Sequence, residues 1–254
     1  AQGKWALQIE TPQAGGPYEI SLSDGKELKL RDVLIGEVWI CAGQSNMEMP
    51  MKGFKAQPVE GAPEELMQCH DRQLRLFTIK RNARLQPVDS VSGSWQEANS
   101  ASVREFSATA YYYGKMLRKA LEVPVGLVVT SWGGSACEAW MNKEWVKSDW
   151  LKAFPKLHTP WNEADVKKYQ QRCPSALYNG MLHPLIGYTM KGVIWYQGED
   201  NCNRYATYAD QMQTLVNSWR KEWKQGIFPF YYCQIAPYDY SLIKWKNNSA
   251  LLRE

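Results

Sequence analysis

The sequence predicts an α/β fold of three layers, in which a doubly wound parallel sheet carries helices on both faces. Two observations lead to this prediction. Short apolar runs rich in β-branched and aromatic residues alternate along the chain with amphipathic segments of 3.6-residue period. Clusters of glycine and polar residues follow three of these runs, at the positions where an open parallel sheet binds ligands.

The first expected element is a β-hairpin over residues 18–33. Apolar and polar residues alternate there on both sides of a turn at residues 23–26, which contains Gly25. An isolated hairpin of this size is only marginally stable. We therefore assign residues 1–32 to the remnant of an accessory β-domain that begins upstream, and residues 33–254 to the main domain.

Five apolar runs are the expected strands of the parallel sheet, at residues 33–42, 74–79, 125–131, 191–196 and 228–235. Two amphipathic helices are expected between them. The first presents on one face Phe106, Ala110, Tyr113, Leu117 and Leu121. The second presents Tyr208, Met212, Leu215, Trp219 and Trp223. Strands and helices that take turns in this way place helices on both faces of a parallel sheet.

Composition excludes several classes of function. The 254 residues are 44% hydrophobic and 22% charged, which is enough apolar material for a large buried core. The formal net charge of +4 comes without a run of like charges, so we expect no nucleic-acid partner. The longest apolar stretch, residues 123–129, is far shorter than the ~20 residues that cross a bilayer, so we expect no membrane partner.

The six cysteines are widely spaced and form no Cys-x-x-Cys pair. This spacing argues against a zinc site and against a redox dithiol, so we expect no metal. Cys41 lies inside an apolar run, where a free cysteine is most often a buried small hydrophobic side chain. The pairing state of the six cysteines stays open.

Ser45 has the setting of an activated nucleophile. It follows a buried strand, comes two residues after Gly43, and stands where a short helix begins. A serine on such a turn is open to substrate, and the amides at the helix start can stabilise an oxyanion. Taken alone, this segment is equally consistent with an ordinary serine at a helix N-terminus.

Two further strand ends carry groups suited to the same chemistry. Gly133 and Gly134 follow the third strand, where a residue without Cβ lets a backbone N–H approach a ligand. Gln197 follows the fourth strand, and its carboxamide could donate a hydrogen bond to an oxyanion, while Glu199 could orient neighbouring groups. Taken singly, each of these segments is also consistent with an ordinary polar turn.

Together the three segments resemble a known family. Gly-Gln-Ser-Asn-Met at 43–47, Trp-Gly-Gly at 132–134 and Trp-Tyr-Gln-Gly-Glu at 195–199 are similar to three successive blocks of the sialate O-acetylesterase and acetylxylan esterase branch of the SGNH hydrolases. The resemblance extends to residues 14–18, 32–39 and 176–181. It implies a flavodoxin-like SGNH-hydrolase form of the α/β fold, and a serine esterase that removes acetyl groups from sugars without a metal or an organic cofactor.

The resemblance also implies roles for single residues. Ser45 would be the nucleophile, and the amides of Ser45 and Gly134 would be two oxyanion donors. The side chain of Gln197 would be the third donor. Glu199 would orient these groups without contacting the substrate itself. Three further residues that follow the strand ends are expected to contact the substrate, namely Asn46, Trp132 and Asn201.

One feature departs from the family pattern. The family completes its catalytic triad with Asp-x-x-His near the C-terminus, whereas none of His70, His158 and His183 has an aspartate three residues before it. We therefore expect the triad histidine beyond residue 254 of a longer chain. We also expect none of the three histidines to lie in hydrogen-bond contact with Ser45.

The expected function is removal of O-acetyl groups from sialic acid. One alternative is an acetylesterase that acts on xylan or another polysaccharide. Another is a non-catalytic carbohydrate-binding module on the same scaffold, for which the missing histidine is the main support. The sequence leaves the oligomeric state open, and because family members are commonly exported, the resemblance implies a periplasmic or secreted protein.

Overall fold

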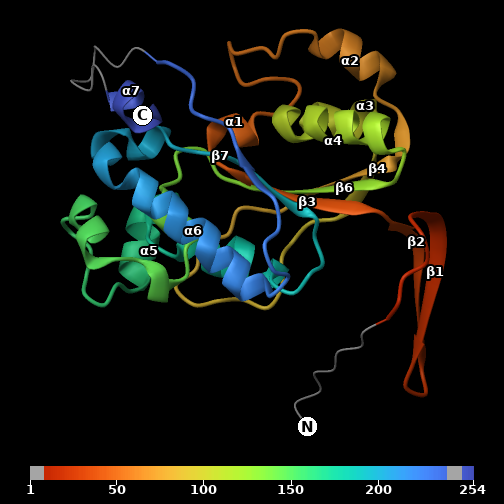
Figure 1. The fold of residues 1–254 in the computed structure, drawn as a ribbon, viewed down its shortest axis with the longest axis horizontal. Helices are drawn as coiled ribbons and strands as arrows, with labels where there is room; N and C mark the ends of the chain where they lie inside the picture. The colour runs from red at the N-terminus through yellow and green to blue at the C-terminus, as the bar shows by residue number, and fades with distance from the viewer. Residues whose placement is uncertain (1–8, 239–247) are drawn as a thin grey trace.

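In the computed structural model of the chain, residues 9–238 and 248–254 are described. Its centre is a six-stranded sheet in the order β5-β4-β6-β3-β7-β8 (Figure 1). The strands are β3 (Glu37–Gly43), β4 (Asp71–Thr78), β5 (Trp95–Ala98), β6 (Val125–Ser131), β7 (Gly192–Tyr196) and β8 (Phe230–Tyr232). All five predicted strands are present, and the α/β fold is confirmed.

The inner strands have the doubly wound order. When β3, β6, β7 and β8 are numbered 1 to 4 in chain order, their order across the sheet is 2-1-3-4. The chain therefore winds to one side of β3 first and to the other side afterwards. β4 and β5 extend the sheet beyond β6, and β5 pairs antiparallel with β4. The sheet is therefore parallel except at this edge, where a short antiparallel strand is a common addition.

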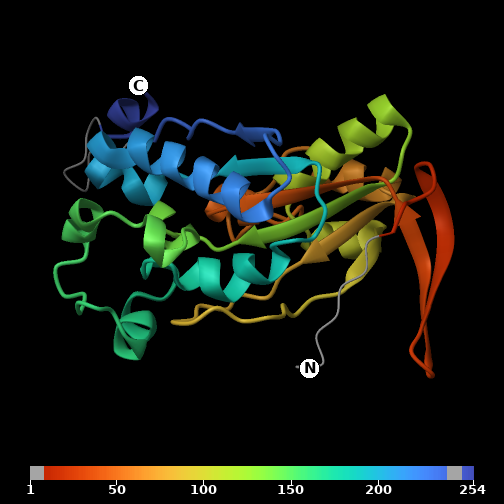
Figure 2. The ribbon, with the colours of Figure 1, turned by 60° about the horizontal axis from the view of Figure 1, so that its bottom comes forward.

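Helices cover both faces of the sheet, as predicted. On one side lie α1 (Ser45–Glu48), α2 (Ala62–Gln68), α3 (Ser100–Glu105) and α4 (Ala108–Leu121), and on the other lies α6 (Tyr208–Trp223) (Figures 1 and 2). The remaining α-helices of the described ranges are α5 (Glu163–Tyr169) and α7 (Asn248–Arg253). None of the helices in these ranges combines the length and apolarity that a bilayer-spanning helix requires.

Alternating side chains of the central strand build two separate cores. Trp39 and Cys41 of β3 pack on the side of α3 and α4, whereas Ile40 between them packs on the side of α6. This is the two-residue period of a strand buried on both faces. On the α6 side, the rings of Trp195 and Trp219 meet edge to face with centroids 5.8 Å apart, so aromatic packing fixes α6 on the sheet.

The predicted hairpin forms a separate two-stranded sheet. Its strands, β1 (Gly15–Ser23) and β2 (Glu27–Ile35), pair antiparallel and project at the end of the molecule opposite α7 (Figure 2). Arg75 of β4 binds the Asp32 carboxylate through two hydrogen bonds of 2.6 and 2.9 Å, which attaches the hairpin to the main sheet. The predicted domain boundary after residue 32 falls within β2, and the division into two domains stays a prediction.

Candidate active site

Three neighbouring strands end at the same level of the sheet. Gly43 at the end of β3 pairs in register with Ser131 of β6 on one side and with Tyr196 of β7 on the other. The segments that follow these ends therefore meet at the carboxyl edge of the sheet, where doubly wound folds bind ligands. This register brings together the three segments that the sequence singled out.

The turn that leads into Ser45 depends on Gly43. A Cβ atom at this position would lie 2.1 Å from the carbonyl oxygen of Tyr196, so only glycine allows the two strands to approach this closely. The Gln44 amide donates to that same oxygen at 2.9 Å, which holds the turn against β7. Ser45 opens α1 and is half-buried, and its hydroxyl has no hydrogen-bond partner in the part of the chain that the structure describes.

Gly133 and Gly134 pack directly on the turn that carries Ser45. A Cβ atom at Gly133 would lie 3.6 Å from Cβ of Ser45 and 2.9 Å from Oε2 of Glu48. Gly134 adopts a φ of 71°, the left-handed conformation that favours glycine. Its amide has no acceptor within residues 9–238 and 248–254, so this N–H remains available to a ligand.

A hydrogen bond of 2.7 Å joins Asn46 of the first segment to Glu199 of the third, with Asn46 Nδ2 donating to Glu199 Oε1. The other carboxylate oxygen of Glu199 is buried and has no partner among the described atoms. Burial raises the pKa of Glu199, although bonds from its own backbone and from Asn46 act in the opposite direction. Asn46 and Glu199 thus hold each other beside Ser45, an arrangement that suits an orienting carboxylate.

The side chain of Gln197 is hydrogen-bonded within the protein. Its side chain is only 2% exposed, and its Nε2 donates both protons to protein acceptors, the Ser135 carbonyl at 3.0 Å and Asn201 Oδ1 at 2.8 Å. Its Oε1 accepts a bond from the Tyr208 hydroxyl at 3.0 Å. In this arrangement both amide protons of Gln197 are bonded within the protein, and its role as a third oxyanion donor stays a prediction.

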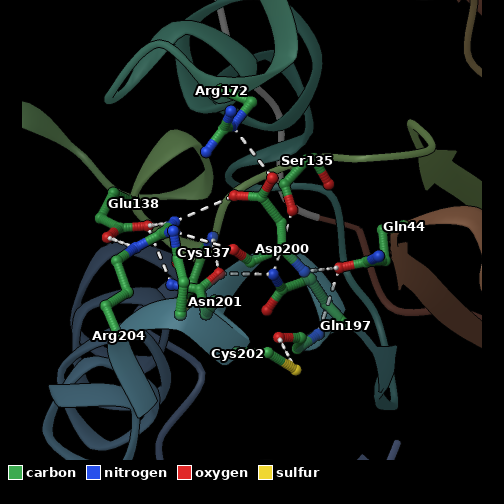
Figure 3. Close-up of polar contacts among 12 residues, drawn as sticks. Gln44, Ser135, Cys137, Glu138, Arg172, Gln197, Asp200, Asn201, Cys202 and Arg204 are labelled. Carbon is green, nitrogen blue, oxygen red and sulfur yellow. Dashed lines mark hydrogen bonds and ion pairs between the residues drawn. The ribbon is translucent and has the colours of Figure 1, made fainter. Parts of the chain in front are cut away.

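Asn201 was predicted to contact the substrate, but its position in the structure does not allow this. Its side chain is completely buried and makes four hydrogen bonds (Figure 3). Oδ1 accepts from the Cys137 amide and from Gln197, and Nδ2 donates to Glu138 and Gln211. Asn201 therefore holds the third segment in place from inside the protein.

A charged network that the sequence did not reveal lies behind Asn201. Glu138 is fully buried, and both its oxygens accept bonds from the Arg204 guanidinium at 3.0 and 3.1 Å (Figure 3). Arg204 also binds Asp200 at 3.0 Å, and Arg172 lies 2.9 Å from the other oxygen of Asp200. These ion pairs connect the third segment to the 3-10 turn at residues 170–172.

Trp132 stands at the start of the glycine segment and is half-buried. The guanidinium of Arg81 lies over its ring, 5.4 Å from the centroid, in a cation–π contact. Part of the ring packs against the core on the α6 side. Its predicted contact with the substrate stays a prediction.

All three histidines of the chain are described, and none forms a hydrogen bond with Ser45. Nδ1 of His158 lies 2.9 Å from Oδ1 of Asp165, at the start of α5. Nδ1 of His183 lies 3.1 Å from a backbone carbonyl oxygen, and His70 is exposed. This agrees with the expectation that none of the three histidines lies in hydrogen-bond contact with Ser45.

Two residues at the site escaped the sequence-based prediction. Glu48 binds the Gly133 amide, and Gln171 Nε2 would lie 3.5 Å from a Cβ atom at Gly134. Glu48 follows Ser45 by three residues, so its position on the same helical turn was a usable signal. Gln171 comes from the 3-10 turn at residues 170–172, far along the chain, and no local pattern marks it.

Comparison with known proteins gives a family match over most of the chain. The family described as "Carbohydrate esterase, sialic acid-specific acetylesterase" matches residues 35–253. The chain is 29% identical to the sialate O-acetylesterase of Rattus norvegicus over 92% of this chain and 50% of that protein. It is 30% identical to the sialate O-acetylesterase of Homo sapiens over 91% of this chain and 46% of that protein.

Among solved structures, the chain resembles a carbohydrate acetylesterase from Xanthomonas citri, with a TM-score of 0.84 and 34% identity. That match covers 98% of this chain and 53% of the other. The chain therefore spans about half the length of the relatives that it matches. Because the family match includes all three segments at the strand ends, the chain belongs to the carbohydrate esterase family of sialic acid-specific acetylesterases.

Proposed function

We propose that this chain carries the nucleophile and the oxyanion donors of a serine esterase that removes O-acetyl groups from carbohydrate, most directly from sialic acid. The observation that carries the proposal is the packing of Gly133 on Ser45, with 3.6 Å between the Cβ position of the one and Cβ of the other. We infer from this packing that the amide of the next residue, Gly134, can reach an oxyanion formed at the serine. A nucleophile with two unengaged amides beside it is the arrangement that acyl transfer requires.

In the proposed reaction, Ser45 Oγ attacks the carbonyl carbon of the acetyl group while a base takes the hydroxyl proton. The electron pair of the carbonyl moves to its oxygen, which accepts hydrogen bonds from the amides of Ser45 and Gly134. The sugar alkoxide leaves as the tetrahedral intermediate collapses, and it takes the proton from the base. Water then hydrolyses the acetyl-serine by the same steps and releases acetate.

We propose that the base is the histidine of an Asp-x-x-His segment outside this sequence. The contacts of His158 and His183 support this, since both side chains are engaged away from Ser45. Without a base, stabilisation of the oxyanion and binding alone give roughly 10³ to 10⁴ over the reaction in water. The 254-residue chain by itself is therefore expected to hydrolyse esters weakly.

Acetate release tests the proposal. The active enzyme, a longer chain that includes the proposed Asp-x-x-His segment, is incubated with O-acetylated sialic acid, acetylated xylan and 4-nitrophenyl acetate, with Ser45→Ala as the matched control. The proposal expects acetate from O-acetylated sialic acid at the highest kcat/KM, and none with Ser45→Ala. Preference for acetylated xylan would reassign the substrate. Binding of glycans without any acetate release would identify a carbohydrate-binding module instead.

A further inference from the structure

The side chain of Gln171 lies against Gly134, the residue whose amide is a proposed oxyanion donor. Its Nε2 atom is 3.5 Å from the position that a Cβ atom at Gly134 would occupy. Sequence neighbours apart, no other heavy atom of the described chain lies within 4 Å of that position, so this side of Gly134 is otherwise open. Gln171 is half-buried, and its side chain makes no hydrogen bond with residues 9–238 or 248–254. Its two N–H groups are therefore available to a ligand.

The backbone around Gln171 is strained. Gln170 has a φ of 47° and Ser175 a φ of 63°, in the left-handed region where residues other than glycine are uncommon. The Ser175 amide donates to the Glu138 carbonyl at 3.0 Å, whereas Ser175 Oγ is buried without a partner among the described atoms. Strain of this kind persists only where the surrounding structure holds it, and it clusters at functional sites. Residues 170–175 are thus held in a conformation that costs stability.

The same segment is fixed relative to the ends of the strands. Nε of Arg172, the residue after Gln171, lies 2.9 Å from Oδ1 of Asp200, which follows β7 (Figure 3). The amide of Asp200 donates to the side chain of Gln44 at 3.4 Å, and Gln44 directly precedes Ser45. An ion pair and a hydrogen bond therefore connect the residue beside Gln171 to the residue beside Ser45.

We propose that Gln171 is a catalytic residue whose carboxamide donates a hydrogen bond to the oxyanion of the acetyl group, and that Arg172 is the positioning residue that holds it there. The inference rests on the proposed function, because the oxyanion forms when Ser45 attacks. A carboxamide with unbonded protons suits this role, since catalytic hydrogen bonds often form only once the substrate is bound. Both protons of Gln197, in contrast, are bonded within the protein.

Substitution of Gln171 in the active enzyme tests this role. Gln171→Met keeps the length of the side chain and removes its donor. We expect kcat to fall about 10²-fold with a smaller change in KM, because the donor acts on charge that develops in the transition state. Gln68→Met, on an exposed position at the end of α2, is the matched control and should change neither constant. An unchanged kcat in Gln171→Met would overturn the proposal.

A second variant repeats the test with a side chain of nearly the same shape. Gln171→Glu places a carboxylate at the same position, which cannot donate when ionised and repels an oxyanion. It is expected to lower kcat at neutral pH at least as far as Gln171→Met does. Thermal unfolding of both variants shows whether the fold is kept. A folded Gln171→Glu enzyme with the kcat of the parent would contradict the proposal.

Two esters identify the part of the substrate that Gln171 contacts. The oxyanion is common to 4-nitrophenyl acetate and to an acetylated sugar, so loss of a donor to it is expected to lower kcat for both by the same factor. A loss confined to the acetylated sugar would make Gln171 a contact of the sugar and would overturn the proposal. So would a rise in KM at constant kcat, because it indicates binding that is equal in ground state and transition state.

A double-mutant cycle tests whether Arg172 acts through Gln171. Arg172→Ala is expected to lower kcat about tenfold, and Arg172→Lys, which keeps a cation beside Asp200, should recover most of it. In the Gln171→Met enzyme, Arg172→Ala is expected to cause no further loss, because the donor that it positions is already absent. Losses that multiply would mean that Arg172 acts independently of Gln171, and its positioning role would fail.

Failure of this proposal can be told apart from failure of the proposed esterase. If Ser45→Ala is inactive while Gln171→Met keeps the kcat of the parent for both esters, the esterase stands and the role of Gln171 fails. If Ser45→Ala itself keeps the kcat of the parent, the esterase proposal fails, and the oxyanion role of Gln171 fails with it.

Discussion

Oε2 of Glu48 accepts a hydrogen bond of 2.7 Å from the Gly133 amide, and Oε1 of the same carboxylate accepts two bonds from Arg81. This carboxylate ties the turn that carries Ser45 to the glycine segment, 85 positions along the chain. The distance between the proposed nucleophile, Ser45, and the proposed oxyanion donor, the Gly134 amide, therefore depends on Glu48. Errors of about 1 Å in such distances can cost about 10² in rate.

In the active enzyme, Glu48→Ala is expected to lower kcat for 4-nitrophenyl acetate about 10- to 100-fold with a smaller change in KM. The reason is that the substitution releases the glycine segment. Glu48→Gln keeps an oxygen that can accept the Gly133 bond, so we expect it to recover most of kcat. Steady-state kinetics on both variants check this. Equal loss of kcat in the two variants would show that the charge, rather than the bond to Gly133, matters.

Ser45→Ala is expected to abolish hydrolysis of 4-nitrophenyl acetate and labelling by a fluorophosphonate, with the fold intact. The hydroxyl has no partner in the described structure, so its removal breaks no stabilising bond. Mass spectrometry of the labelled protein and thermal unfolding give the two readouts. A variant that unfolds at the same temperature and still turns over the ester would remove Ser45 from the mechanism.

Gln197→Ala separates two roles for this side chain. Because its amide protons are bonded to the Ser135 carbonyl and to Asn201, we expect the variant to lose about 1–3 kcal/mol of unfolding free energy. Urea unfolding measures this. An oxyanion donor would instead give a fall in kcat of about 10² to 10³ at unchanged stability, and that result would restore the role predicted from sequence.

The position of Ser45 could be predicted from sequence because it depends on local pattern. A buried strand, a glycine and the start of a helix are all visible within ten residues, and parallel strands bring their carboxyl ends to one edge. The register of Gly43 with Ser131 and Tyr196 then follows from the sheet itself.

The direction of a polar side chain at a strand end could not be predicted in this way. Gln197 and Asn201 look like exposed polar residues after a strand, yet their partners Ser135 and Glu138 come from 62 and 63 positions away. Only the folded chain shows that these acceptors occupy the protons that a ligand would need. The same holds for β5, whose antiparallel pairing depends on an edge of the sheet that has no local signal.

Arg204→Ala is expected to destabilise the protein by about 3–5 kcal/mol, because it leaves the Glu138 carboxylate buried without its cation. Urea unfolding followed by circular dichroism measures the loss. Lys152→Ala, which breaks an exposed pair with Asp149, is the matched control and should leave the unfolding curve unchanged. A stable Arg204→Ala protein would mean that the ion pair with Glu138 contributes little to the unfolding free energy.

The stability of the protein is expected to depend on pH through Glu199. Burial raises the pKa of this carboxyl in the folded protein, so between its ordinary value of about 4.3 and its folded value the native state holds more protons than the unfolded state. Stability contributed by Glu199 is therefore greatest below about pH 4.3 and is lost as the pH rises through the folded pKa.

Glu199→Gln cannot titrate, so the difference in unfolding free energy, native protein minus variant, should fall with rising pH across this window and level off above it. Urea unfolding from pH 4 to pH 8 measures the difference at each pH. Glu64→Gln, on an exposed position of α2, is the control and should show no such fall. A difference that rises with pH would mean that the bond from Asn46 outweighs burial, so that the folded protein favours the carboxylate over the acid.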